Sequence, residues 1–231
     1  KMRYMFGGQA TLPVTFRIRM FYARGAAAHH SDRNYPLFMN TPGLKILCPS
    51  NAYDAKGLLK SAVRDNDVCM MFEDGIAISS TTEVPNNEDI PSGELLVPFG
   101  KARVVLEGSD CTVVGIAGGV DHALKAAEQM KAEGVSLEVI DPRTLVPLDM
   151  STILKSVEKT GRLVVVDPAH KVCSAASEIA ATVAQEGFWS LQAPIMTVAS
   201  EQVNIPYSPA LEPLVYPTPA KVIDAVKKII T

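Results

Sequence analysis

The chain has 231 residues, of which 47% are hydrophobic and 20% charged, so it can bury one large core or two modest ones. Its formal net charge is −3 at pH 7, and no run of Lys and Arg offsets that balance locally. Such a charge creates no field that attracts nucleic acid, which argues against a nucleic-acid-binding role. No apolar run reaches the roughly 18–20 residues that cross a bilayer, so we expect no membrane partner.

Strands and one helix are predicted in the first third of the chain. The predicted strands are residues 13–17, 44–48 and 68–73, and residues 52–64 form a predicted helix with Asn51 as its N-cap. Residues 75–100 show no steady period and are rich in proline and asparagine, so we expect a domain boundary there. The elements before this boundary are too few for an independent α/β core. We therefore expect the first half of that domain to be absent from the sequence or supplied by another chain.

The remaining chain alternates short apolar runs with amphipathic stretches. After an opening segment at 102–106, the predicted strands are 112–116, 136–140, 163–166 and 195–199, and the predicted helices are 120–133, 150–159, 175–186 and 220–230. Successive strand–helix steps predict a doubly wound parallel sheet with helices on both faces. Gly134 is expected to take a left-handed turn, and Thr218 is expected to cap the last helix. That helix should pack its apolar side on the sheet.

Four cysteines, at positions 48, 69, 111 and 173, lie far apart and form no Cys-x-x-Cys pair. Three of them sit in or beside apolar runs, where a free thiol behaves as a small hydrophobic group. We expect all four to be reduced and structural.

Two adjacent histidines are the main candidates for chemistry. His29 and His30 follow Gly25 and three alanines, on what the sequence predicts to be a small-residue turn near solvent. An imidazole there could donate or accept a proton at a carbonyl group. The alternative, two loop histidines that only hydrogen-bond the backbone, stays open. We predict no metal site, because neighbouring side chains diverge and no third ligand is indicated.

A glycine-rich turn at residues 115–119 lies between a predicted strand and a predicted helix, with Asp141 at the end of the next strand. This arrangement imitates a dinucleotide-binding turn. The spacing is not Gly-x-Gly-x-x-Gly, however, and tight strand-to-helix turns use glycine for geometry alone. We expect a structural turn and no nicotinamide cofactor.

Several motifs together resemble one family. Gly25 to Ser31 reads GAAAHHS, residues 42–45 read PGLK, residues 97–102 read VPFGKA, and residues 139–149 read VIDPRTLVPLD. In this order they are similar to the beta subunit of the thiamine-diphosphate-dependent 2-oxo acid dehydrogenases, a branch of the transketolase superfamily. The resemblance covers nearly the whole chain.

The resemblance implies an α/β fold in which a partial thiamine-pyrimidine-type domain is followed by a transketolase C-terminal-like doubly wound parallel-sheet domain. We place the first domain at residues 1–88, a linker at 89–101 and the second domain at 102–231. The chain departs from the family pattern at residues 18–21, where a glycine-proline turn is replaced, and at 168–174, where a glycine-rich segment is replaced. Arg143 and Asp149 lie in the matching signature, and we expect structural roles for both, the aspartate as a helix cap.

By resemblance, the chain supports oxidative decarboxylation of a 2-oxo acid, of the pyruvate type, and acyl transfer to lipoyl groups. Acetoin cleavage and a non-catalytic docking or assembly module are the alternatives. His30 takes the position of a histidine that lines the active-site channel, and His29 stands where the family often has glutamine, so both remain catalytic candidates. The implied partners are an alpha subunit, in a heterodimer or an alpha-two beta-two tetramer, a lipoyl acyltransferase core and a small 2-oxo acid.

The implied cofactor is thiamine diphosphate with Mg²⁺, shared with the alpha subunit. The glutamate that contacts the aminopyrimidine ring in this family is expected upstream of Lys1, so no cofactor-binding residue is assigned here. We expect the Mg²⁺ ligands on the alpha subunit, and we expect the chain on its own to be inactive. The implied location is the cytoplasm of a bacterium, or an organelle matrix if a targeting segment precedes this sequence.

Overall fold

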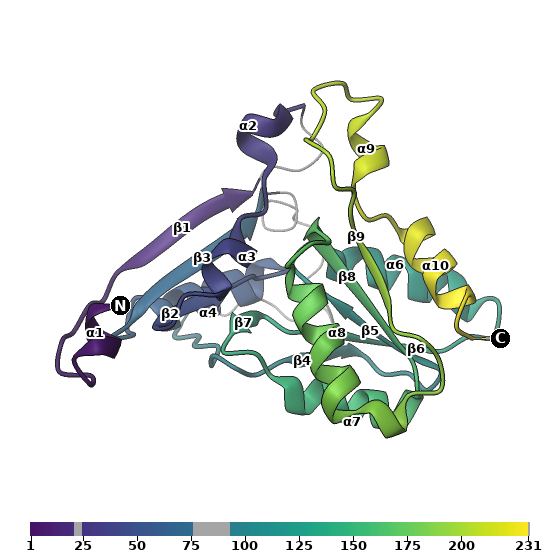
Figure 1. Cartoon of the computed structure of the whole chain (residues 1–231), viewed down its shortest axis with the longest axis horizontal. Coiled ribbons are helices and arrows are strands. Elements are labelled where there is room, and N and C mark those ends of the chain that lie inside the picture. Colours follow the sequence, from purple (N-terminus) through teal and green to yellow (C-terminus); the bar gives the residue numbers. More distant parts are fainter. Residues whose placement is uncertain (21–24, 76–92, 231) are drawn as a thin grey trace.

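The computed structural model describes residues 1–20, 25–75 and 93–230, which contain two β-sheets (Figure 1). The first sheet has the strand order β1-β3-β2-β7, and the second has the order β4-β6-β5-β8-β9. Two predictions fall partly outside the described residues. Phe21, the last residue of the departure at 18–21, is one case. The other is the irregular region, of which residues 76–92, including the first four residues of the predicted linker, are not described.

The first sheet is built mainly from the N-terminal part of the chain. Its strands β1 (Thr15–Met20) and β2 (Leu44–Leu47) both run parallel to β3 (Val68–Asp74). Helix α4 (Ala52–Ala62) covers one face and begins where the Asn51 side chain accepts a hydrogen bond from the Asp54 N–H at 2.8 Å. The predicted cap is therefore confirmed. Three short helices were not predicted: α1 (Met2–Met5), α2 (Ala27–Ser31) and α3 (Tyr35–Met39).

Strand β7 (Thr144–Val146) comes from the C-terminal half of the chain but joins the first sheet. It pairs antiparallel with β2. The pairing continues past the strands, because the N–H of Cys48, directly after β2, donates to the carbonyl oxygen of Arg143, directly before β7, at 2.9 Å. A three-residue strand is too short to show an alternating pattern, so the sequence did not predict it. The two halves of the chain are thus joined by backbone hydrogen bonds.

The second sheet carries the alternating elements of the C-terminal half. Its strands are β4 (Arg103–Leu106), β5 (Cys111–Gly115), β6 (Leu137–Asp141), β8 (Leu163–His170) and β9 (Met196–Ser200). Strands β5, β6, β8 and β9 are parallel, whereas β4 runs antiparallel to β6, so the predicted parallel sheet has an antiparallel edge. Strand β8 continues four residues beyond its predicted end, because a register shift between Asp167 and His170 accommodates Pro168.

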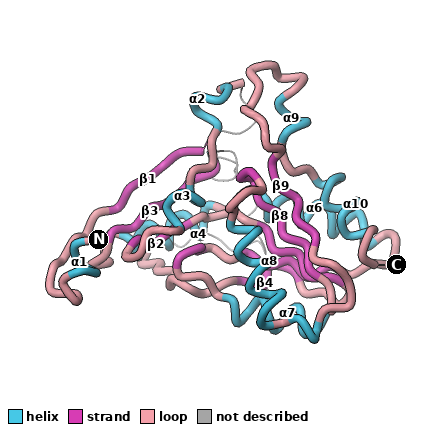
Figure 2. The backbone as a smooth tube through the Cα atoms, in the orientation of Figure 1, coloured by secondary structure: helices cyan, strands magenta, loops and turns pink. Residues whose placement is uncertain are grey.

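Helices cover both faces of the second sheet, as the doubly wound prediction requires (Figures 1 and 2). Helices α6 (Gly119–Lys131) and α10 (Pro219–Lys227) pack together on one face, and α7 (Met150–Thr160) and α8 (Ala175–Glu186) pack on the other. Thr218 caps α10 by accepting from the Lys221 N–H at 3.2 Å, and Val222 and Val226 are fully buried. Gly134 has φ +83°. The predictions for the last helix and for this glycine are confirmed.

One buried cluster joins the two sheets into a common core. Its fully buried members include Met20, Tyr35, Ile46 and Phe72 from the first part of the chain and Val114, Ile140, Ile153 and Val165 from the second. Full burial of an aliphatic or phenyl side chain contributes about 1.5–3 kcal/mol. The two halves therefore stabilise each other.

All four cysteines are free, and Cys48, Cys69 and Cys111 are buried while Cys173 is exposed. The prediction of structural thiols is confirmed for the buried three, whose thiol pKa values burial raises. Within the described ranges, no helix is both long enough and apolar enough to cross a membrane.

Candidate active site

The two candidate histidines lie on α2, a five-residue helix and not the predicted turn. The backbone enters it through left-handed conformations at Gly25 (φ +61°) and Ala27 (φ +56°). Both histidine side chains are exposed, and their ring centroids lie 6.4 Å apart. The structure therefore presents two neighbouring imidazoles to solvent.

Both ends of α2 are bound by residues at the two ends of helix α9 (Glu212–Val215), which faces α2 in Figure 1. The Gly25 N–H donates to the Glu212 Oε2 at 2.9 Å. At the other end, the Arg33 Nη1 donates to the Ser31 carbonyl oxygen and to the Tyr216 hydroxyl, the latter at 2.9 Å. We call Gly25, Arg33, Glu212 and Tyr216 the α9 clamp.

A second contact between the two domains follows directly after α2. The Tyr35 hydroxyl donates to the Asp167 Oδ1, and the Asp167 carboxylate also accepts from the N–H groups of Ala169 and Ala176, each at 2.9 Å. Burial raises the pKa of Asp167, and burial together with the Asp167 charge raises the pKa of Tyr35 well above its ordinary value. The tyrosine therefore keeps its proton and fixes α3 to the end of β8.

A third contact between domains involves Arg143, which follows β6. The Arg143 Nη2 lies 2.8 Å from the Asp54 Oδ1, and the backbone N–H of Arg143 donates to the Asp141 Oδ1 at 2.8 Å. The Ser50 hydroxyl donates to the Asp141 Oδ2. The pKa of Asp141 is raised to about 7, mainly by burial and secondly by the nearby Asp54 charge. The structural role expected for Arg143 is confirmed.

Asp149 has the expected structural role as well. Its Oδ1 accepts from the Thr152 N–H at 3.2 Å at the start of α7, and its Oδ2 accepts from the Ala102 N–H at 3.1 Å. These hydrogen bonds favour the charged carboxylate, and the pKa of Asp149 is lowered although burial acts in the opposite direction. The helix-cap prediction is confirmed.

Other atoms of the chain already fill the space beside the glycine-rich turn at residues 115–119. A Cβ on Gly119 would lie 2.7 Å from the Val166 carbonyl oxygen, and one on Gly118 would lie 2.6 Å from the Asp74 Oδ2. The buried Asp74 carboxylate thus stands beside the start of α6, where a dinucleotide would place its negatively charged phosphates. This geometry favours the structural interpretation of the turn.

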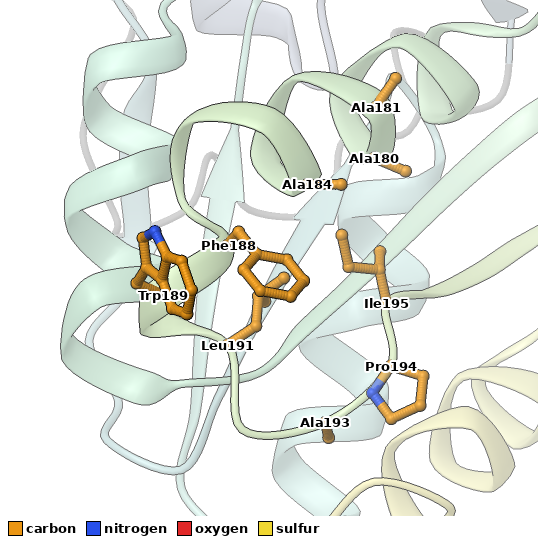
Figure 3. A pocket seen from close by; sticks show the side chains of 9 residues that line it. All are labelled: Ala180, Ala181, Ala184, Phe188, Trp189, Leu191, Ala193, Pro194 and Ile195. Atoms are coloured by element: carbon orange, nitrogen blue, oxygen red, sulfur yellow. The ribbon is translucent and has the colours of Figure 1, made fainter.

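An apolar groove of about 720 Å³ lies beside α8, between that helix and the segment that leads into β9 (Figure 3). Its lining residues are Ala180, Ala181, Ala184, Phe188, Trp189, Leu191, Ala193, Pro194 and Ile195. None of these side chains is charged or able to transfer a proton. The groove is therefore a poor candidate for catalysis, and the histidines on α2 remain the candidate site.

Sequence reasoning missed the residues that hold α2 in place. Arg33 and Tyr216 are 183 positions apart, and Tyr35 and Asp167 are 132 apart. The polar residues after the histidines were visible in the sequence, but no pattern linked them to a distant partner. Only the fold brings these pairs together.

Two family models match the chain. Residues 1–77 match the transketolase pyrimidine binding domain, and residues 100–222 match the transketolase C-terminal domain. Over 232 residues the chain is 44% identical to the acetoin:2,6-dichlorophenolindophenol oxidoreductase subunit beta of Bacillus subtilis. Over 229 residues it is 42% identical to the pyruvate dehydrogenase E1 component subunit beta of Rhizobium meliloti. The chain belongs to the transketolase family, in its dehydrogenase beta-subunit branch. The predicted family is thus confirmed.

The matches cover 100% and 99% of this chain but only 66% and 49% of those two relatives. The chain thus spans less than two thirds of the length of either beta subunit. Among solved structures, one described as "Split gene transketolase, inactive beta4 tetramer" has a TM-score of 0.75 at 22% identity, covering 95% of this chain and 67% of that one. This likeness concerns the fold, and it agrees with the predicted transketolase-type architecture.

Proposed function

We propose that this chain forms part of the beta subunit of a 2-oxo acid dehydrogenase of the pyruvate type. It would support thiamine-dependent oxidative decarboxylation and acyl transfer to lipoyl groups. The observation that carries the proposal is an exposed histidine pair on α2, held by both matched domains in a chain 42% identical to a pyruvate dehydrogenase beta subunit.

Thiamine diphosphate is the cofactor that the matched transketolase domains imply. When bound, it supplies the electron sink that decarboxylation of a 2-oxo acid requires. The described residues do not fit the whole group. Their fully buried glutamates, Glu138 and Glu212, already accept hydrogen bonds from Lys159 and Gly25, and no three His, Cys, Asp or Glu side chains among them are placed to hold a metal ion.

We therefore assign the missing groups to other parts of the assembly. The carboxylate for the aminopyrimidine ring is placed upstream of Lys1, and the contacts to Mg²⁺ and diphosphate are placed on an alpha subunit that shares the cofactor. Further proposed partners are a lipoyl acyltransferase core and a small 2-oxo acid. The proposed location is the bacterial cytoplasm or an organelle matrix.

The contribution of this chain is a proton donor and acceptor on α2. An imidazole nitrogen of His30 would donate a proton to, or accept one from, the oxygen of the substrate carbonyl. His29 is the second candidate, because it lies next to His30 on the same exposed helix. The contacts with α9 hold the chain on both sides of the histidine pair, which helps to place an imidazole beside a bound substrate.

The test uses His30→Ala and His29→Ala in the complete complex with its alpha subunit, assayed for pyruvate decarboxylation. We expect His30→Ala to lower kcat by about 10²–10⁴-fold, the usual contribution of a positioned acid or base. His29→Ala should have a smaller effect. Native mass spectrometry should show normal assembly and cofactor occupancy in both variants. Unchanged turnover in an assembled His30→Ala complex would remove His30 from the mechanism.

Acetoin cleavage is the second candidate function, favoured by the 44% identity to the Bacillus subtilis subunit. The same purified complex should be assayed with pyruvate and with acetoin at equal concentrations. A higher kcat/KM for pyruvate supports the first proposal, and a higher value for acetoin supports the second. Turnover of neither substrate by an assembled, cofactor-loaded complex would support a non-catalytic docking or assembly module.

A further inference from the structure

Helix α2 is too short to hold its own position. It has five residues, and isolated helices below about 12–15 residues are marginal in water. Its orientation therefore depends on what contacts its ends. At one end the contact is the hydrogen bond from the Gly25 N–H to Glu212, and at the other it is the hydrogen bond from Arg33 to Tyr216.

The three side chains of the α9 clamp are buried, unlike the histidines that they flank. The exposed fractions of Arg33, Glu212 and Tyr216 are 6%, 1% and 1%. The Arg33 guanidinium carbon also lies 4.5 Å from the centroid of the Tyr216 ring. Hydrogen bonds that involve a charged partner are roughly twice as strong as neutral ones, and burial keeps water from replacing them.

We propose that Arg33, Glu212 and Tyr216 are positioning residues for the α2 histidines, a role that rests on the proposed function of those histidines. The three side chains hold α2 against the C-terminal domain and set the direction in which His29 and His30 project. They act through the helix and touch no reacting atom. A displacement of about 1 Å at a reacting group can lower a rate by about 10²-fold, so a small loosening of α2 is enough to be measured.

The first test is Tyr216→Phe in the complete complex, because this change removes the hydroxyl that accepts from Arg33 and keeps the ring. We expect kcat to fall by about 10- to 100-fold, with KM, assembly and cofactor occupancy close to the starting protein. The matched control is Tyr207→Phe, a tyrosine shortly before α9 whose exposed fraction is 75%. It should leave kcat unchanged. An unchanged kcat in Tyr216→Phe would overturn the proposal.

A second test separates positioning from a general structural role. If Tyr216 acts mainly through His30, then Tyr216→Phe should cause a much smaller loss of kcat in a His30→Ala background than in the starting protein. Losses that multiply in the double variant would show that Tyr216 acts independently of His30 and would contradict the proposal.

A third test measures how firmly the α9 clamp holds α2 and does not depend on enzyme turnover. Hydrogen–deuterium exchange of a peptide covering residues 25–33 should be about tenfold faster in Tyr216→Phe than in Tyr207→Phe, since the last turn of α2 has lost its anchor. Equal exchange in the two variants would overturn the clamp whatever the kinetics show. Full turnover in His30→Ala, by contrast, would contradict the proposed function and with it the catalytic role of the clamp, while faster exchange in Tyr216→Phe would still show that the clamp holds α2.

Discussion

At the scale of single residues, Asp141 is the titrating group with the clearest consequence. Burial, followed by the nearby Asp54 charge, raises its pKa to about 7 in the folded chain, whereas an aspartate in an unfolded chain has a pKa of about 3.9. The folded state therefore binds this proton more tightly than the unfolded state. The resulting stabilisation is complete below about pH 4 and is lost as the pH rises through about 7.

Asp141→Asn should remove this dependence. The asparagine Oδ1 can still accept from the Arg143 N–H, and its amide can donate to the Ser50 hydroxyl oxygen. We expect the unfolding temperature of the variant to change less between pH 5 and pH 8 than that of the starting protein. At pH 8 the unfolding temperature of the variant should equal or exceed that of the starting protein. Asp121→Asn is the control, because its side chain is 55% exposed. A variant with the same pH slope as the starting protein would contradict this assignment.

The residue scale also shows what sequence reasoning can find. His29 and His30 were predicted because small residues and a family motif surround them. Contacts of Glu212 and Tyr216 with α2 were not predicted, since their partners lie more than 180 positions away in the sequence. Long-range hydrogen bonds leave no local pattern in a single sequence.

At the scale of elements, the turn into α6 depends on glycine. A Cβ on Gly119 would meet the Val166 carbonyl oxygen, a backbone atom of the interior strand β8 that cannot swing aside. Gly119→Ala should therefore lower the free energy of unfolding by about 1–3 kcal/mol, as overpacking typically does. Gly93→Ala is the matched control, because no heavy atom lies within 4 Å of a Cβ built there. Urea unfolding measures both variants, and equal stabilities would contradict this role of Gly119.

The long helices and most of the strands were predicted within a few residues, whereas several short elements were missed. Helices α7 and α8, with 11 and 12 residues, are long enough for their periodicity to be read, and strands β5 and β6 were predicted as short, mainly apolar runs. The missed elements β7, α2, α3 and α9 have three to five residues each. Contacts with the other domain stabilise them more than their own sequences do.

At the scale of the whole molecule, the two domains form one unit around the candidate site. Strand β7 crosses into the first sheet, Arg143 contacts Asp54, Tyr35 contacts Asp167, and α9 holds both ends of α2. The histidines project from the element that both domains fix. The fold class followed from the alternating elements and the family motifs, whereas this coupling between domains followed only from the structure.

The central claim is that this chain supplies the histidine-bearing part of a thiamine-dependent dehydrogenase beta subunit. Native mass spectrometry of the protein purified from its own source, with thiamine diphosphate and Mg²⁺ present, tests it most directly. We predict an assembly that contains a second, alpha-type subunit and bound thiamine diphosphate. A single species of 24.8 kDa, with no partner subunit and no cofactor, would contradict the claim.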